Sequence, residues 1–219
     1  MKGTMMILAA ILLTSATATA QNPAGKAKKE KKASYISLGP AAGFGHSWVS
    51  NSINTFKPSA HLGIGLMYSR HEHWAFGDML TVSHEGYTRE VYAMGNTYHN
   101  TYNPVYLRMT PRVYYFFGDY KNNIRPKVFL GPSVAYKLAE EQNIEQPLIP
   151  TEAWYLRPGG DMFSTMDFGA NAGAGVNIKI APYTWLNLDA DYYHGLVNVT
   201  NAGNQNRALR ANVGVMIGL

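Results

Sequence analysis

The sequence predicts an all-β fold: an eight-stranded antiparallel up-and-down transmembrane β-barrel with short periplasmic turns and long extracellular loops. Three observations predict it: an apolar leader suited to export, strand-length segments in which apolar and polar residues alternate, and connections that alternate between short and long. The final segment, LRANVGVMIGL at 209–219, shows the alternation clearly. Its odd-numbered residues are all apolar, whereas Arg210 and Asn212 lie on the other face.

The first twenty residues have the organisation of a secretory signal peptide. Lys2 precedes an apolar run at 5–13, which is too short for a membrane span of ~20 residues. The small residues Ala18 and Ala20 then form a cleavage pattern. We therefore expect residues 1–20 to be a signal peptide and the protein to be exported. The chain contains 0 cysteines, which argues against a disulfide-rich secreted domain.

A basic segment follows the predicted cleavage site. Residues 21–33 carry five lysines and one glutamate without apolar periodicity, so we expect a disordered periplasmic tail. Contact of this tail with anionic lipid or cell-wall polymer is the alternative to a plain solvated linker. The remaining domain, 34–219, has equal numbers of basic and acidic residues. The sequence therefore gives no indication of nucleic-acid binding.

Eight segments of the domain have the length and alternation of strands. In order, they are 35–44, 60–69, 74–86, 104–117, 127–138, 166–180, 184–195 and 207–219. The short connections are 70–73, 118–126 and 181–183, and the long ones are 45–59, 87–103, 139–165 and 196–206. Short turns at one end and long loops at the other are typical of an outer-membrane barrel. In the third segment Asp78 shares the face of Leu80, which predicts a bulge or a shifted register.

The two faces of the strands differ in a way that favours a membrane barrel. The polar face is rich in glycine and carries few charges of both signs, as a narrow lumen requires. Charges removed from water need partners. The predicted lumenal charge network consists of Arg108, Arg112, Asp167, Asp189, Asp191 and Arg210. Rings beside the short turns predict an interfacial aromatic belt of Tyr68, Trp74, Tyr115, Phe117, Tyr183 and Trp185.

Five segments together resemble a known family. YISLGPAAGFG, VFLGPSVAYKL, FGANAGAGVNIKI, LNLDADYYHGLVNV and LRANVGVMIGL are similar to the successive strands of PorT-like outer-membrane β-barrel proteins. The resemblance covers 34–219. It implies a barrel surrounded by outer-membrane lipid in a Gram-negative bacterium and inserted by the barrel-assembly machinery. Some members of the family assist a protein-secretion apparatus.

The candidate catalytic and metal-binding patterns are weak. Asp189, Asp191 and His194 could together activate a water molecule, but His194 has the opposite parity to the two carboxylates. His71 and His73 are spaced as two metal ligands without an evident third. We therefore predict that the protein is not an enzyme and that it has no catalytic residues, no metal and no cofactor.

The predicted function is that of a structural or interaction protein. Eight strands enclose an interior just wide enough for side chains to fill, which argues against a general porin. The longest loop, 139–165, carries candidate contact residues for a protein partner at the extracellular side. They are Leu148, Ile149, Trp154, Tyr155 and Leu156. Two alternatives stay open: a soluble exported lipocalin-like barrel with apolar residues around a ligand, and an outer-membrane hydrolase that uses Asp189, Asp191 or a histidine.

Overall fold

The computed structural model describes residues 35–50, 56–93, 96–144 and 163–219. The predicted signal peptide, the basic tail and the loop residues Leu148, Ile149, Trp154, Tyr155 and Leu156 lie outside the described residues. The strands of the described part are β1 (Ile36–Val49), β2 (Pro58–Tyr68), β3 (Trp74–His84), β4 (Tyr87–Ala93), β5 (Asn96–Phe116), β6 (Ile124–Ile144), β7 (Met166–Ala181), β8 (Thr184–Gly195) and β9 (Asn206–Gly218). Within these ranges, no helix is long and apolar enough to cross a membrane.

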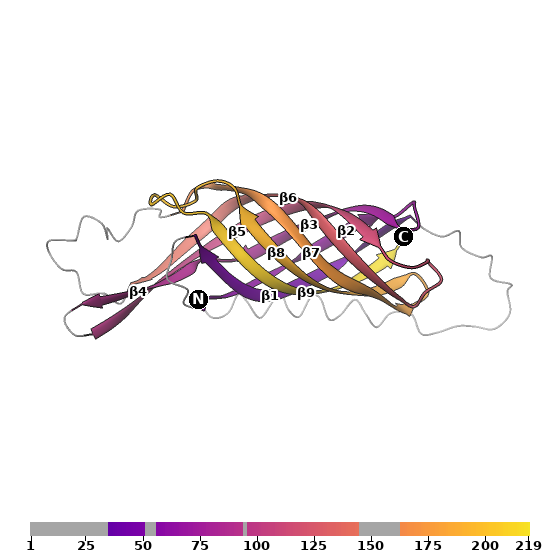
Figure 1. Cartoon of the computed structure of the whole chain (residues 1–219), viewed down its shortest axis with the longest axis horizontal. Coiled ribbons are helices and arrows are strands. Elements are labelled where there is room, and N and C mark those ends of the chain that lie inside the picture. The colour runs from indigo at the N-terminus through magenta and orange to yellow at the C-terminus, as the bar shows by residue number, and fades with distance from the viewer. Residues whose placement is uncertain (1–34, 51–55, 94–95, 145–162) are drawn as a thin grey trace. The chain divides into compact units, whose positions relative to one another are not determined.

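Eight of these strands form a closed antiparallel ring (Figure 1). The order is β3-β2-β1-β9-β8-β7-β6-β5, and β5 pairs with β3 to close it. The paired residues, followed once round the ring from Ile36, are Tyr68, Phe76, Val113, Leu130, Ala172, Tyr192, Leu209 and finally His46. The path returns to β1 ten residues further along, which is the stagger that tilted strands need to close a barrel. The predicted fold class is confirmed.

The ends of the ring differ. At one, which we call the short-turn end, residues 69–73, 117–123 and 182–183 connect the strands, and the C-terminus lies there (Figure 1). At the other, the long-loop end, β4 pairs among the described strands only with β5, and these two strands extend with the outer part of β6 beyond the ring (Figure 1). β5 and β6 each have 21 residues and are therefore longer than the alternation predicted.

The third predicted strand, 74–86, ends at His84, and the connection 87–103, predicted to be a loop, instead contains β4 and the first part of β5. Gly86 has φ of 128°, a value that residues with a side chain rarely adopt. A Cβ at this position would also lie 1.9 Å from the carbonyl oxygen of Tyr102. Glycine therefore allows the chain to change direction between β3 and β4 while both strands stay paired with β5.

The predicted irregularity at Asp78 is wrong. The register of β3 with β2 and with β5 runs through this residue without a shift. Asp78 therefore lies on the outward face with Leu80, and its Oδ1 accepts a hydrogen bond of 3.0 Å from the backbone N–H of Thr110. This bond satisfies part of the carboxylate on an otherwise apolar surface.

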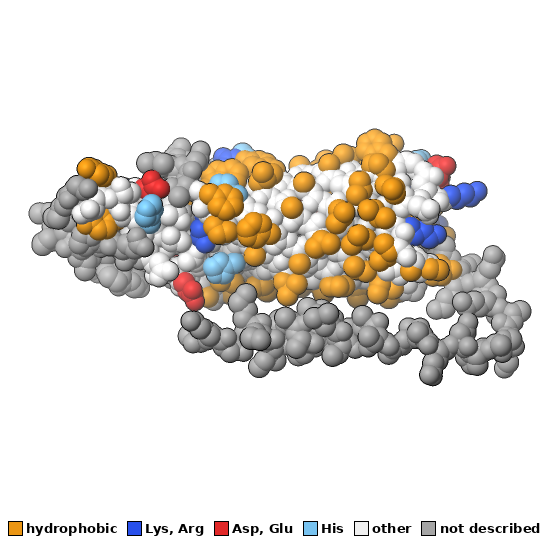
Figure 2. Space-filling view, turned by 90° about the horizontal axis from the view of Figure 1, so that it is seen from below, with side chains coloured by type: hydrophobic (Ala, Val, Ile, Leu, Met, Phe, Trp, Pro, Cys, Tyr) orange, Lys and Arg blue, Asp and Glu red, His pale blue; other side chains and the backbone are white. Residues whose placement is uncertain are grey.

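The barrel is apolar outside and polar inside. Large apolar side chains such as Ile64, Phe76 and Leu130 are exposed on the outer wall, whereas arginines, asparagines and aspartates are buried in the lumen. Figure 2 shows hydrophobic side chains spread along the barrel wall and charged ones gathered towards its ends. A soluble barrel would have the reverse arrangement. The lipocalin-like alternative, with an apolar interior, is therefore wrong.

Candidate functional site in the barrel lumen

Arg108 on β5 is the centre of a first group of charges, which lies near the long-loop end. Its Nε and Nη2 donate to the two carboxylate oxygens of Glu85 at 3.0 and 2.8 Å, and Nη2 also lies 3.0 Å from Asp167 Oδ2. Nη1 donates to Ser133 Oγ at 3.1 Å, and the guanidinium lies 4.1 Å from the ring centroid of Tyr193. Arg108 is 1% exposed, so this group is removed from water and held by paired charges.

Asp191 on β8 collects a second group of donors in the middle of the lumen. Arg210 Nε donates to its Oδ1 at 2.9 Å, and Arg112 Nη2 lies 3.4 Å from its Oδ2. The side-chain amides of Asn171 and Asn212 donate at 2.8 and 2.7 Å. One carboxylate therefore joins β5, β7, β8 and β9 across the barrel.

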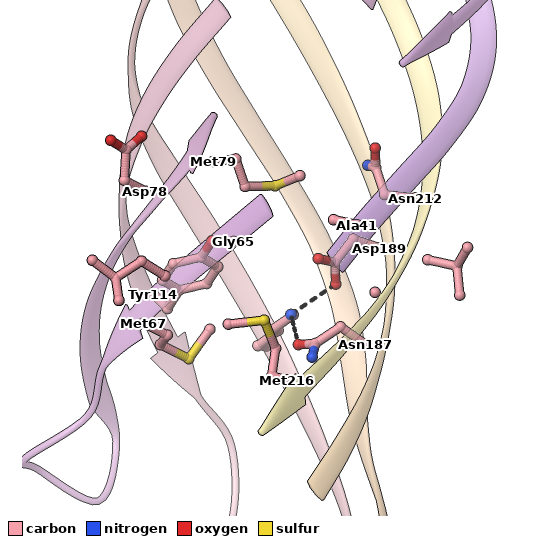
Figure 3. A pocket seen from close by; sticks show the side chains of 14 residues that line it. Ala41, Gly65, Met67, Asp78, Met79, Tyr114, Asn187, Asp189, Asn212 and Met216 are labelled. Carbon is pink, nitrogen blue, oxygen red and sulfur yellow. Dashed lines mark hydrogen bonds and ion pairs between the residues drawn. The ribbon is translucent and has the colours of Figure 1, made fainter. Parts of the chain in front are cut away.

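A third group lies nearer the short-turn end. Lys127 Nζ is 2.9 Å from Asp189 Oδ1 and donates to Asn187 Oδ1 at 2.8 Å. In Figure 3 the dashed lines that end on Asp189 and Asn187 mark these two contacts, and Met216 is drawn close to them. A cavity of about 30 Å³ lies at this level, roughly the share of liquid volume of one water molecule.

Apolar clusters lie on either side of the ion pairs. Near the short-turn end the buried side chains of Met67, Ala75, Tyr114, Phe116, Phe129 and Met216 pack together. At the long-loop end the cluster comprises Val49, Tyr87, Tyr102, Phe163 and Val199. Gly173 makes room for this packing, because a Cβ there would lie 2.5 Å from the Phe129 ring. The described lumen is thus filled with side chains at several levels.

The six residues of the predicted charge network all face this lumen, but they do not form one network. Asp167 pairs with Arg108, whereas Arg112 and Arg210 share Asp191. Asp189 pairs with Lys127 and not with an arginine. Sequence reasoning did not single out Glu85, the bidentate partner of Arg108. The available signal was a lone acidic residue immediately before Gly86, where the strand pattern ends.

The structure departs from the predicted aromatic belt at Trp185, and Tyr183 also lines a cavity at the short-turn end. Tyr68, Trp74, Phe117 and Tyr183 are exposed at the short-turn end, and Tyr115 is half-buried there. Trp185 instead shares the inward face of β8 with Asn187, because side chains alternate along a strand, and it lines a cavity at this end of the lumen. Trp185 lies beside a turn, as the belt residues do, but it is an even number of residues from Asn187, and this spacing already predicts an inward side chain.

The weak catalytic pattern is divided by the barrel wall. Asp191 is buried in the lumen, whereas His194 lies on the outer side, where its ring contacts the guanidinium of Arg207. His73 uses Nδ1 in a hydrogen bond of 3.0 Å with the carbonyl of Phe116. In the part of the chain that the structure describes, no three histidine, cysteine or acidic residues are grouped as metal ligands.

The comparison with protein families agrees with this architecture. Residues 19–201 match the family described as outer membrane protein beta-barrel domain. The chain belongs to this family. Membership places the apolar wall against the lipid of the outer membrane, and hence the short-turn end in the periplasm and the long-loop end outside the cell.

Two solved structures have a similar fold. Neisserial surface protein A is 16% identical with a TM-score of 0.51, over 86% of this chain and 100% of that one. OprG from Pseudomonas aeruginosa is 10% identical with a TM-score of 0.54, over 85% of this chain and 96% of that one. No curated protein matches the sequence. At these identities the two structures support the fold alone.

Proposed function

We propose that this protein is a non-conducting, non-enzymatic barrel of the outer membrane that acts as a structural or interaction protein through its extracellular end. The observation that carries the proposal is the filled lumen. Each of the buried cations Arg108, Arg112, Lys127 and Arg210 has a carboxylate partner inside the barrel. Moving them aside for an ion or solute would leave uncompensated charges in a poorly hydrated interior, at a cost of several kcal/mol.

The extracellular end supplies the surface for such a role. β4, the outer part of β5 and the outer part of β6 form a three-stranded sheet beyond the ring. Among the described residues, the outer edge of β4 pairs with no other strand, and Tyr92 near its tip is 76% exposed. Exposed strand edges and aromatic side chains are common in protein recognition. The partner in this proposal is a protein at the cell surface.

The family resemblance refines the proposal. The glycine-rich strand motifs favour the PorT-like branch, with a role beside a protein-secretion apparatus and insertion by the barrel-assembly machinery.

Conductance measurements in planar lipid bilayers test the closed lumen. We expect the refolded protein to insert without a stable conductance step, whereas a reproducible step in the wild type would contradict the proposal. The hydrolase alternative is tested with lipid esters of the outer membrane. Turnover by the wild type that is lost in a folded Asp191→Asn variant would replace our proposal with that alternative.

Cross-linking on intact cells tests the interaction role. Deletion of 143–160 should leave a heat-modifiable, inserted barrel and remove any discrete cross-linked species. Deletion of 201–203, which shortens another connection at the same end, is the matched control and should retain that species. Failure of the 143–160 deletion to insert, or persistence of the same species, would contradict the assignment of partner contacts to this loop.

A further inference from the structure

A cavity of about 450 Å³ lies at the periplasmic end of the lumen, between the ion pairs and the short turns. Its inner end is lined by the apolar side chains of Met67, Phe116 and Met216. Tyr183, in the short connection between β7 and β8, and Trp185, near the start of β8, lie nearer the opening. The volume falls in the range of about 300–1,000 Å³ that is typical of small-molecule pockets.

Arg125 gives this cavity a cationic wall. It is 3% exposed, and its guanidinium lies 4.5 Å from the ring centroids of both Phe116 and Tyr120. It donates to the backbone carbonyl of Glu72. Unlike Arg108, Arg112, Lys127 and Arg210, Arg125 forms no ion pair with a carboxylate among the described residues. A second cation, Lys179, also lines the cavity.

Two buried polar atoms at this site lack a hydrogen-bond partner in the described structure. They are Nε of Arg125 and Oδ1 of Asn177, whose residue is 7% exposed and also lines the cavity. Buried donors and acceptors in native proteins are nearly always satisfied by protein, water or ligand. A buried guanidinium that lines a cavity of this size without a carboxylate partner favours an anionic ligand there.

The wall beside Arg125 is held in place by hydrogen bonds between turns. The Tyr120 hydroxyl oxygen lies 2.7 Å from the backbone carbonyl oxygen of Ser69 and 2.9 Å from that of His71, and its single proton can be donated to either. These bonds fix the turn that follows β5 against the turn that follows β2. The Tyr120 ring, over which the Arg125 guanidinium lies, is therefore held in place without a ligand.

We propose that this cavity binds a carboxylate that is attached to an aromatic or short aliphatic group and enters from the periplasm. The carboxylate meets Arg125, and the apolar group packs on Met67, Phe116 and Met216. Two sources share this chemistry: a free small molecule, and the C-terminal residue of a periplasmic peptide. Lys179, which lines the cavity together with Arg125, disfavours a cationic ligand.

Binding of N-acetyl-L-phenylalanine and of its neutral carboxamide tests the proposal. The full mature chain is placed in lipid nanodiscs, which leave both ends of the lumen accessible, and heats of binding are measured. We expect the acid to bind at least about tenfold more tightly than the amide, since a charge-assisted hydrogen bond contributes that much or more. Absence of saturable binding by the wild type, or equal binding of acid and amide, would overturn the proposal.

Variants assign the binding to the cavity. Arg125→Gln should lose the preference for the acid, whereas Lys121→Gln removes an exposed cation of a neighbouring turn and should keep it. Ser37→Phe leaves Arg125 intact and fills the cavity that Ser37 lines, so it should abolish binding of the acid. If Arg125→Gln does not refold, this variant alone decides whether the acid binds in the cavity. Unchanged binding by a folded Arg125→Gln or Ser37→Phe protein would refute the site.

A peptide distinguishes the two sources. A hexapeptide that ends in phenylalanine is compared with its C-terminally amidated form. Tighter binding of the free-acid peptide than of N-acetyl-L-phenylalanine indicates a chain end as the ligand. Binding of the small acid alone indicates a free small molecule, and both results support the carboxylate site.

Discussion

Replacement of Arg108 by methionine should destabilise the barrel strongly. The substitution keeps a long apolar stem but removes the guanidinium that pairs with Glu85 at 2.8 Å and with Asp167 at 3.0 Å. These carboxylates are 3% and 0% exposed, so they cannot be solvated by water in place of the arginine. Breaking one buried pair typically costs about 3–5 kcal/mol. Because two carboxylates lose the same partner, we expect a loss of about 5 kcal/mol in the free energy of unfolding.

Urea unfolding of the refolded protein in lipid vesicles, followed by tryptophan fluorescence and by mobility in unboiled gels, measures this loss. Arg70→Met, which removes an exposed cation from a periplasmic turn, is the control and should change stability by no more than about 0.5 kcal/mol. The triple variant Arg108→Met with Glu85→Gln and Asp167→Asn should recover more than half of the loss, because no buried charge of this group is then left without its partner. A loss below about 1 kcal/mol for Arg108→Met, or a triple variant less stable than the single one, would refute the reasoning.

Three further predictions concern the wall, the packing and the extracellular cluster. Leu130→Arg on the lipid face should lower the free energy of unfolding by about 2–4 kcal/mol. Leu196 is similarly exposed but lies in a loop, so Leu196→Arg should lower it little. Similar losses for both variants in urea unfolding would contradict the assignment of Leu130 to the lipid face. Gly173→Ala should cost about 1–3 kcal/mol because its Cβ would lie 2.4 Å from a carbonyl oxygen, while Gly65→Ala, with 3.4 Å to its nearest atom, should be tolerated better. Burial raises the pKa of Tyr87 to about 12, so the native state keeps the phenol proton at a pH at which the unfolded chain loses it. The contribution of Tyr87 to the free energy of unfolding should therefore be lost as pH rises from about 10 to 12. A Tyr87→Phe protein whose stability falls with the same slope over this pH range would contradict this.

The architecture could be predicted because a β-barrel repeats one simple pattern. In the last strand, alternation alone separates Val213 and Ile217 from Asn212, and the structure exposes the first two and buries the third. The bulge expected at Asp78 shows the limit of this reasoning. A carboxylate among apolar residues suggested an irregular strand, but a hydrogen bond to Thr110 allows the regular strand to continue.

The pairing inside the lumen could be predicted only in part. Strand parity places Asp189 and Asp191 on the same inward face, but their partners depend on the tilt of strands that are far apart in the sequence. The stagger of the closed ring brings Lys127 to Asp189 and leaves Arg112 and Arg210 with Asp191. Glu85 could not be assigned from alternation because the chain turns at Gly86, where the pattern stops.

The most direct test of the account concerns which face of β9 meets lipid. Because the chain has 0 cysteines, a spin label can be placed on a single introduced cysteine, either at Val213 on the outward face or at Met216 on the inward face. Collision with oxygen, which concentrates in lipid, is then measured by electron paramagnetic resonance in bilayers. We predict high oxygen accessibility for the label at position 213 and low accessibility at 216. The reverse order would contradict the central claim that the apolar face of this barrel is turned outward to the membrane.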